Sequence, residues 1–351
     1  MSKRIAIIGA GMAGTAAAAR LRAAEQQVVL FDKGRGVGGR MSARRTDDAL
    51  FNHGASYICA RTLNFERQVE RWRQAGVIRE AEAARFAQQN GILKPVQPDS
   101  LSRPVYVGVP GMNEPLRWLS SDGEIRTERR IDSLIPKDDG WHLQSVGGID
   151  EGMYDAVIVA TPAPQAAVLL EAHTYIADFA NQIAMAPLWV TMLSFEEKPG
   201  VAFDSILFEN GPLSMAYCAT DIKGIPDQRH WVIRASESWS MEHVEASSED
   251  VMAELLRAFC TCDPAFAGRP TSYATVHRWR FAFCCEPREE ASMFDERKMI
   301  AVCGDWFQHP DMLEKGATDP IAYRTGGIER AFLSGTDAAE RLLMGIGAFT
   351  E

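Results

Sequence analysis

The fold is decided by the stretch Ile5-Ala-Ile-Ile-Gly9-Ala-Gly11-Met-Ala-Gly14 and by Val28-Val-Leu-Phe-Asp32, which follows it. An apolar run of strand length leads into G-x-G-x-x-G, and the glycines lead into an Ala-rich segment of helical length. A second apolar run then ends in an acidic residue. This order predicts a complete βαβ dinucleotide-binding unit. The alternative is a glycine-rich turn that serves packing alone.

Each residue of the turn has a physical reason to be there. Gly9 permits a tight turn, Gly11 lets the backbone approach a pyrophosphate, and Gly14 lets the helix pack closely on the strand. Free N–H groups and the positive dipole end at the helix start, around Met12 and Ala13, favour phosphate. Asp32 lies where its carboxylate accepts hydrogen bonds from an adenosine ribose.

The segment after the acid distinguishes between dinucleotides. It reads Lys33-Gly-Arg35-Gly-Val-Gly38-Gly39-Arg40-Met41, which resembles the glutathione-reductase-like and amine-oxidase-like flavoproteins. The resemblance implies that this segment, including Lys33, Gly39 and Met41, wraps the pyrophosphate of FAD. Arg35 and Arg40 then supply positive charge. The alternative is a solvated loop with two surface arginines.

Three later segments resemble the same flavoproteins. Ala160-Thr161-Pro162 resembles the strand end beside the dinucleotide, and Gly304-Asp305 resembles a motif whose acid hydrogen-bonds the ribityl or phosphate part of FAD. Gly327-Ile328-Glu329 resembles the start of the final helix, whose N-terminus points at the flavin. There the helix dipole stabilises negative charge on the reduced flavin.

The middle of the chain resembles one subfamily. The segments that resemble bacterial renalases, an offshoot of the amine oxidases, are Arg40-Met-Ser42, His53-Gly-Ala-Ser-Tyr57, Pro110-Gly-Met112, Ala160 to Gln165 and His277-Arg-Trp279. Renalases oxidise 2- and 6-dihydro isomers of NAD(P)H, transfer the hydride to the flavin and reoxidise it with O₂ to give H₂O₂. The resemblance therefore implies FAD, a small-molecule dihydronicotinamide substrate and O₂.

Two departures from renalases bear on the substrate. Asn52 stands where the subfamily usually has Asp, and Phe307–Tyr323 forms a longer stretch than expected, which we place near the substrate side of the flavin. We take Tyr57, His277 and Trp279 as the candidate catalytic residues, with Trp306 as a further wall. His277 positions a carboxamide, tunes the charge of the site or satisfies a buried hydrogen bond. Trp279 and Trp306 stack on a ring or fill the core.

Composition narrows the class of protein. The 351 residues are 46% hydrophobic and carry a net charge of −10, which argues against nucleic-acid binding through a basic face. There is no apolar run of membrane-spanning length, and the N-terminal apolar run is predicted to be a strand and not a secretory signal. Seven cysteines without zinc or C-x-x-C spacing favour reduced thiols in a cytoplasmic protein without a metal site.

We predict an α/β fold. A Rossmann-type FAD-binding domain, with glutathione-reductase-like and p-hydroxybenzoate-hydroxylase-like architecture, accompanies a discontinuous substrate domain with a mixed or antiparallel sheet. The predicted FAD-binding domain comprises residues 1–60, 103–165 and 298–351, and the substrate domain comprises residues 61–102 and 166–297. Within them we expect one strand over Ile125–Ile135, a hairpin turn at Gly147-Gly148 and a helix over Ser248–Cys260.

The functional hypothesis is an FAD-dependent oxidase with non-covalently bound FAD that acts on dihydronicotinamide isomers. Two alternatives remain open: an amine or amino-acid oxidase or a desaturase of a secondary metabolite, and a flavin-binding protein without turnover.

Overall fold

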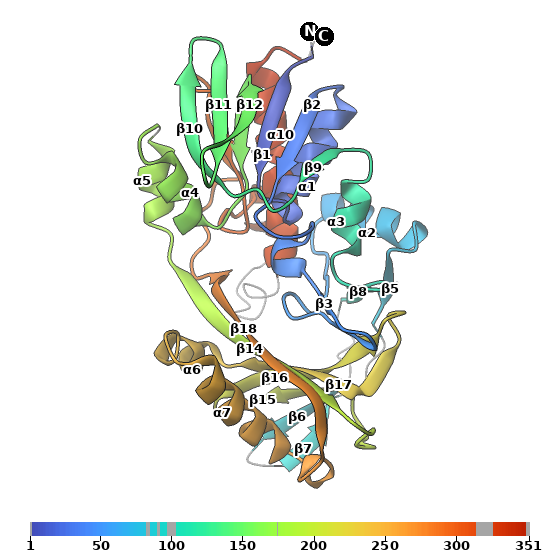
Figure 1. Ribbon diagram of the computed structural model, residues 1–351. Coiled ribbons are helices and arrows are strands. Elements are labelled where there is room, and N and C mark those ends of the chain that lie inside the picture. Colours follow the sequence, from blue (N-terminus) through green and yellow to red (C-terminus); the bar gives the residue numbers. More distant parts are fainter. Residues whose placement is uncertain are drawn as a thin grey trace.

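The protein is described by a computed structural model that covers residues 2–81, 85–89, 92–96, 103–173, 175–313 and 326–348. Two sheets face each other across the molecule, with the N-terminal unit above and a larger sheet below (Figure 1). None of the helices in the described ranges is long and apolar enough to cross a membrane. The seven cysteines all lie in those ranges and form no disulfide.

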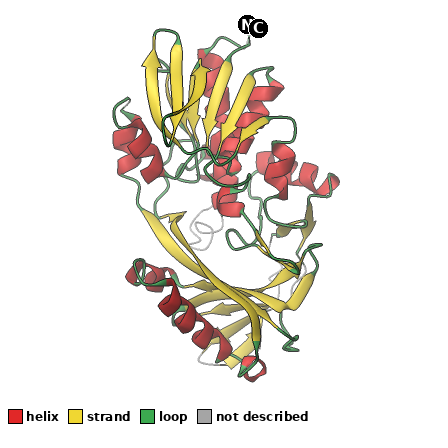
Figure 2. Ribbon diagram, in the orientation of Figure 1, coloured by secondary structure: helices red, strands yellow, loops and turns green. Residues whose placement is uncertain are grey.

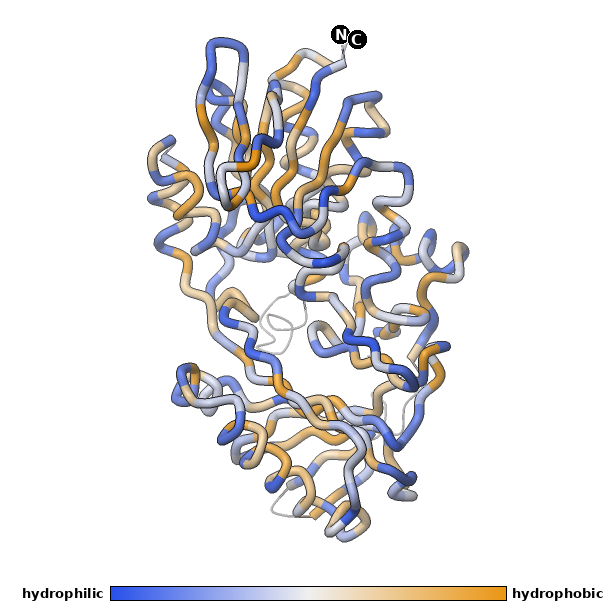
Figure 3. Tube along the Cα trace, viewed as in Figure 1, coloured by the Kyte–Doolittle hydropathy of each residue, from blue (hydrophilic) through white to orange (hydrophobic). Residues whose placement is uncertain are grey.

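The upper unit contains the predicted dinucleotide-binding topology. Its six-stranded sheet has the order β19-β20-β13-β1-β2-β9, parallel except where β19 meets β20. The strands are β1 (Arg4–Ile8), β2 (Gln27–Phe31), β9 (Glu124–Arg126), β13 (Ala156–Val159), β19 (Met293–Asp295) and β20 (Ile300–Val302). Hydrophobic residues run along its central strands (Figure 3) because both faces are covered.

Helices pack on both faces of this sheet. The first core joins α1 (Met12–Ala23), α2 (Leu63–Gln74), α3 (Glu114–Leu119) and α10 (Gly327–Gly345). The second core joins α4 (Ala163–Leu170), α5 (Ile176–Asn181) and a three-stranded sheet of β10 (Ile131–Lys137), β11 (Gly140–Ser145) and β12 (Ile149–Tyr154). Residues from 166 to about 183 therefore share a core with this unit, although we expected them in the substrate domain.

Two sequence-based expectations in this unit have different outcomes. The hairpin turn at Gly147-Gly148 is confirmed, because both glycines have positive φ between β11 and β12. The single strand over Ile125–Ile135 is wrong, because β9 belongs to the six-stranded sheet and β10 to the three-stranded one. The chain leaves one sheet after Arg126 and enters another, which alternation alone does not reveal.

The lower sheet is mostly antiparallel and contains nine strands. Seven follow the order β18-β14-β17-β16-β15-β6-β7, and the hairpin β3–β4 joins at β16. Its strands are β3 (Arg44–Arg45), β4 (Ala49–Phe51), β6 (Arg85–Gln89), β7 (Ile92–Pro95), β14 (Met185–Phe195), β15 (Ser205–Phe208), β16 (Leu213–Asp221), β17 (Pro226–Ala235) and β18 (Thr271–Cys284).

One face of this sheet is covered and the other looks towards the upper unit. Helices α6 (Glu237–Glu242) and α7 (Ser248–Cys260) lie on the far side (Figure 2). The helix α7 matches its predicted bounds, and its apolar residues Val251, Leu255 and Phe259 enter the core below the sheet. The opposite face is therefore free to form the lower wall of a site.

The other elements of the described residues are short: 3₁₀ turns at Gly39–Met41 and Pro264–Phe266, β5 (Ile78–Glu80) paired with β8 (Tyr106–Gly108), and α8 (Pro310–Leu313).

Candidate active site

The glycine-rich turn has the geometry that close packing and a phosphate cradle require. Gly9 has φ +109°, and a Cβ there would lie 2.8 Å from the carbonyl oxygen of Ala160. A Cβ on Gly14 would overlap the carbonyl oxygen of Gly9. A Cβ on Gly11, by contrast, would meet nothing nearer than the Cα of Gly39, at 3.9 Å. Gly9 and Gly14 thus serve packing, while Gly11 leaves open space above the start of α1.

Asp32 holds this turn to the next loop. Its Oδ2 accepts a hydrogen bond from the backbone N–H of Ala10 at 2.8 Å, and its Oδ1 accepts one from the N–H of Gly34 at 2.7 Å. Lys33 and Arg35 follow along the cavity wall. The role of Asp32 towards a ribose stays a prediction, and the structure adds a second role in shaping both loops.

We expect Asp32→Ala to weaken FAD retention by tenfold or more. The variant loses the proposed ribose contact and leaves two N–H groups without their acceptor, and each hydrogen bond to a charged group is worth about 1.5–3 kcal/mol. The measurement is flavin released on dilution, followed by fluorescence. Full flavin occupancy in the purified variant would show that Asp32 does not bind the cofactor.

The Gly-Gly-Arg segment differs from expectation in the charge that Arg40 presents to the cavity. Gly39, with φ +49°, packs close to Gly11, and Met41 anchors the segment in the core. The Arg40 guanidinium makes two hydrogen bonds of 2.7 Å to the Asp305 carboxylate, which is nearly buried. Arg40 and Asp305 both line the cavity, but each largely neutralises the other. The positive charge predicted for Arg40 is therefore shared with Asp305.

The start of α10 faces the same cavity, which Gly327 and Ile328 line together with Gly304. No side chain caps the first turn at Gly326, so its N–H groups remain available.

Glu329 has a structural role that the sequence did not predict. Its carboxylate is 1% exposed and does not line the cavity. It accepts hydrogen bonds from the backbone N–H groups of Arg61 and Thr62 and from the Thr62 hydroxyl, at 2.7 to 3.2 Å. Glu329 therefore joins α10 to the start of α2 through its carboxylate, and its role towards the cofactor stays a prediction.

The strand end after β13 also opens to the cavity. Ala160 and Thr161 line it, and the Thr161 hydroxyl is buried without a hydrogen-bond partner among the described residues. An unpartnered buried hydroxyl is costly unless a ligand satisfies it. Trp306 is different, because it is fully buried and its indole N–H donates to the Thr161 carbonyl. The expectation that Trp306 forms a wall is therefore wrong.

The opposite wall comes from the lower sheet. His277 and Trp279 lie on β18 and line the cavity, with ring centres 4.4 Å apart. Their neighbour His53 lies 4.9 Å from His277, and its carbonyl accepts a hydrogen bond from the Trp279 indole at 3.0 Å. The three side chains form an aromatic cluster, which we call the His–Trp cluster.

Both histidines of the His–Trp cluster are neutral at pH 7. Burial, together with the nearby charges of His277 and Arg44, lowers the pKa of His53 to about 4. Burial and Arg44 also lower the pKa of His277. The Nδ1 atom of His53 is buried without a partner in the described part of the chain. The sequence motif around His53 was recognised, but the proximity of His53 to His277 was not.

Tyr57 lines the cavity, together with residues that the sequence did not identify as candidates for the site. Burial raises the pKa of Tyr57, so its hydroxyl is a hydrogen-bond donor. Asn52, which replaces the usual acid, accepts a hydrogen bond from the Met112 N–H at 2.9 Å through its side-chain oxygen. Asn52 therefore fixes the neighbouring loop.

The part of the Phe307–Tyr323 stretch from residue 314 onward lies outside the described residues, and Phe307 itself is buried in the second core.

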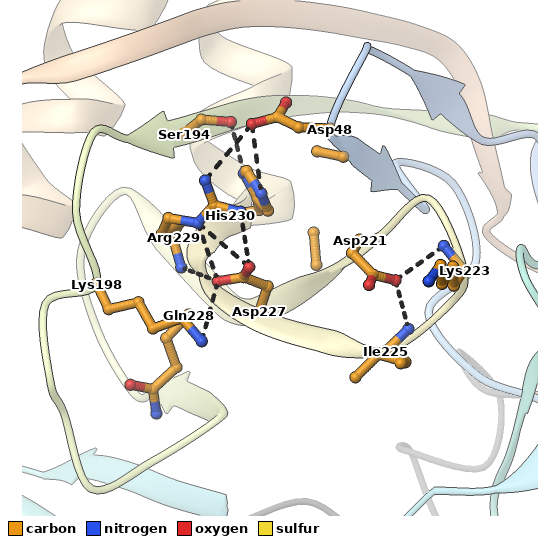
Figure 4. A network of polar contacts seen from close by, with 12 residues as sticks. Asp48, Ser194, Lys198, Asp221, Lys223, Ile225, Asp227, Gln228, Arg229 and His230 are labelled. Carbon is orange, nitrogen blue, oxygen red and sulfur yellow. Dashed lines mark hydrogen bonds and ion pairs between the residues drawn. The ribbon is translucent and has the colours of Figure 1, made fainter.

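A Ser–His–Asp set near β3–β4 proves to be structural (Figure 4). Ser194 Oγ lies 2.8 Å from His230 Nδ1, and Asp48 lies 4.0 Å from His230 Nε2. Ser194 and His230 are both buried in the sheet, so no substrate reaches the hydroxyl. The set instead helps to dock the hairpin that carries Arg44, since Arg229 also lies 3.7 Å from Asp48.

All these walls enclose one large cavity of about 2680 Å³ between the two sheets. Single-ligand pockets measure roughly 300–1,000 Å³, so this one holds a dinucleotide and a substrate together. The open space at Gly11, the uncapped start of α10 and the unpartnered Thr161 hydroxyl lie on the upper wall. They fit an elongated cofactor with a pyrophosphate.

Family comparisons agree with this geometry. A family described as flavin containing amine oxidoreductase matches residues 99–343, and one described as NAD(P)-binding Rossmann-like domain matches residues 7–72. The chain belongs to the flavin-containing amine oxidoreductase family. Members of this family contain a flavin, typically FAD, and the predicted α/β fold agrees with the family.

The curated relatives are similar to this chain over short stretches. The 4,4'-diapophytoene desaturase of Staphylococcus haemolyticus (strain JCSC1435) is 48% identical over 54 residues, which are 15% of this chain and 11% of that protein. The enzyme of Staphylococcus aureus (strain Newman) is 42% identical over 55 residues, or 16% of this chain and 11% of that protein. The matches thus span about a tenth of these relatives.

Solved structures resemble this chain over nearly its whole length. A putative protoporphyrinogen oxidase from Exiguobacterium sp. 255-15 has TM-score 0.70 and 14% identity, covering 99% of both chains. Putrescine oxidase bound to putrescine has TM-score 0.72 and 12% identity, covering 98% and 99%. Cyclohexylamine oxidase from Brevibacterium oxydans IH-35A has TM-score 0.69 and 11% identity, covering 99% and 100%. At these identities the likeness is one of fold.

Proposed function

We propose that this protein is an FAD-dependent oxidase that takes a hydride from 2- or 6-dihydro isomers of NAD(P)H and passes the electrons to O₂ to give H₂O₂. Family membership supports flavin-dependent oxidation, and the resemblance to renalases supports the substrate. The observation that carries the substrate class is the positive charge on the lower wall of the cavity. Arg44 and Arg234 have no carboxylate partner within the described ranges. Such a wall attracts phosphates and repels an ammonium group.

The upper wall has the groups that hold the cofactor. Gly11 and the first turn of α1 present N–H groups to the pyrophosphate, and Asp32 presents its remaining acceptor capacity to the ribose. The N-terminus of α10 lines the cavity, where its dipole would favour negative charge on a bound flavin. Bound FAD supplies the redox chemistry, so the protein needs few acids or bases of its own.

The lower wall orients the substrate. Trp279 and His277 offer ring faces and a neutral imidazole, and the neutral state leaves one nitrogen free to accept a hydrogen bond. A hydride donor must be held in one orientation for rapid transfer. The His–Trp cluster supplies that orientation because its members pack on one another.

A second candidate is the oxidation of an amine or the desaturation of a secondary metabolite. It is favoured by the family description and by the local similarity to desaturases. Under this alternative the arginines would bind a carboxylate remote from the reacting carbon.

Anaerobic stopped-flow mixing tests the proposal. The purified flavoprotein is mixed with 6-dihydroNAD, with putrescine or with buffer, and flavin absorbance is followed. We expect bleaching by 6-dihydroNAD alone and H₂O₂ formation when air is admitted. Bleaching by putrescine alone would establish the second candidate, and bleaching by neither donor would sink the proposed substrate.

Single substitutions at His277 and Trp279 should separate turnover from cofactor binding. We expect His277→Ala and Trp279→Ala to keep the flavin spectrum and slow flavin reduction by roughly tenfold to a hundredfold, because the donor loses its orientation. The measurement is the limiting rate of reduction in stopped flow. Wild-type rates in both variants would mean that the reacting site lies elsewhere and that His277 is a core histidine.

We also expect FAD to be bound without a covalent link. The cavity-lining thiols of Cys218 and Cys284 have raised pKa values of about 12 because they are buried, so they are poor nucleophiles. Acid precipitation should release all the yellow colour into the supernatant. Flavin that stays with the pellet would contradict this expectation.

A further inference from the structure

Cationic side chains outnumber carboxylates along the cavity, although the whole chain is acidic. Some of these cations are neutralised by ion pairs. Arg40 pairs with Asp305, and Arg278 and Arg280 both pair with Glu245. A second group of lining cations has no carboxylate partner within the described residues: Lys33, Arg35, Arg44, Arg45, Arg79, Arg85, Arg130 and Arg234.

Within this second group, Arg234 has the most constrained position. It lies on β17, opposite Val190 of β14 and Met215 of β16, and therefore in the middle of the lower sheet. Its strand neighbour Ile233 points into the core under α7, so Arg234 projects from the opposite face, towards the cavity. Its Nε is buried and has no hydrogen-bond partner among the described residues. A buried guanidinium nitrogen without an acceptor is costly unless a ligand provides one.

The surroundings of Arg234 are suited to a bound anion. The guanidinium carbon lies 5.6 Å from the centre of the Phe283 ring, which holds the side chain in place. Tyr57, Arg85 and Arg234 line the same cavity, and the charges of both arginines act on the Tyr57 hydroxyl. The Tyr217 hydroxyl is already used, because it donates to the Asn52 carbonyl at 2.6 Å. Tyr57 therefore remains as the hydroxyl donor beside two cations.

We propose that Arg234 and Tyr57 form an oxyanion-binding subsite in the cavity, at the lower sheet. This subsite holds a phosphate or carboxylate of the substrate. Arg234 offers a planar set of N–H donors, which suits the paired oxygens of either group. Arg85 adds charge from the edge of the site. This inference rests on the proposed function and deepens it, because it names the residues that select anionic substrates.

The subsite is distinct from the region that receives the cofactor pyrophosphate. Gly11, the start of α1 and Arg35 belong to the upper unit, whereas Arg234 lies on the opposite sheet. A substrate held between the cofactor region and the lower sheet would place its anionic group at Arg234 and its reduced ring nearer the His–Trp cluster. The subsite would therefore set substrate affinity with little effect on cofactor retention.

Calorimetric titration of the flavin-loaded protein tests the subsite without requiring turnover. The probes are inorganic pyrophosphate and benzoate, which separate a phosphate site from a carboxylate site. We expect Arg234→Met to raise the Kd of the bound probe tenfold or more, and Tyr57→Phe to raise it by a smaller factor. Arg234→Lys should raise the Kd by a smaller factor than Arg234→Met, because it keeps the charge but loses the planar pair of N–H donors. The matched control is Arg280→Met, which removes a lining charge already paired with Glu245 and should bind as wild type does.

The outcomes separate the subsite from the proposed substrate. Binding of either probe that depends on Arg234 supports the subsite, even if 6-dihydroNAD fails to bleach the flavin and the proposed function falls. If Arg234→Met and wild type bind both probes equally, or bind neither, the subsite is overturned. Should Arg234→Met lose its flavin or its folded structure, Arg234→Lys and Tyr57→Phe decide. A raised Kd in both variants supports the subsite, and wild-type affinity in both overturns it.

Discussion

Gly14→Ala is expected to abolish flavin binding and to lower the free energy of unfolding by about 3 kcal/mol or more. The added methyl group would overlap the carbonyl oxygen of Gly9, which is a backbone atom, so the backbone of the turn would have to move. Overpacking in a core costs typically 1–3 kcal/mol, and a clash with backbone lies at or above the upper end of that range. The measurements are flavin content after purification and chemical unfolding.

Two other glycine substitutions provide the comparison. Gly11→Ala places its methyl group 3.9 Å from the nearest protein atom, so the fold should remain stable while flavin affinity falls. Gly36→Ala meets nothing within 4 Å and should resemble wild type in both measurements. If Gly11→Ala keeps full flavin content, the open space above α1 does not hold the pyrophosphate.

Glu329→Ala is expected to lower the free energy of unfolding by on the order of 3–5 kcal/mol. The substitution leaves the N–H groups of Arg61 and Thr62 and the Thr62 hydroxyl without their acceptor in a buried place. Each hydrogen bond to a charged group contributes about 1.5–3 kcal/mol, and part of this is recovered by water. Thermal and urea unfolding of the flavin-loaded protein measure the loss.

Glu340→Ala is the matched control on the same helix. Glu340 is more exposed and forms one ion pair with Arg20 at 3.3 Å, so its removal should cost less than about 1 kcal/mol. If Glu329→Ala keeps wild-type stability but loses flavin, Glu329 contacts the cofactor after all, as its sequence motif suggested.

Local sequence was sufficient where a short segment forms its own contacts. The hairpin at Gly147-Gly148 and the approach of Gly14 to Gly9 are local, because they involve glycines within a few residues of one another. The helix over Ser248–Cys260 was predicted to its exact bounds because Ser247 caps it and its apolar face has helical spacing.

Longer-range features were missed for a common reason. The strand β16 (Leu213–Asp221) has no clean alternation, since it lies inside a wide sheet and packs on both faces. The strand expected over Ile125–Ile135 divides between two sheets. Trp306 was a reasonable wall candidate by position, but its indole is turned into the core beneath Thr161.

The sequence by itself determined the βαβ unit, the flavoprotein family and most residues of the cofactor wall, because these follow from short motifs with a fixed backbone geometry. Only the tertiary structure decided how distant residues meet. It pairs Arg40 with Asp305, buries Glu329 against Thr62, and brings His53 beside His277. It also directs Arg234 to the cavity, where its buried Nε has no hydrogen-bond partner among the described residues. Charge and hydrogen bonding act between side chains in space, so the chemistry of the substrate wall depends on contacts that no local pattern encodes.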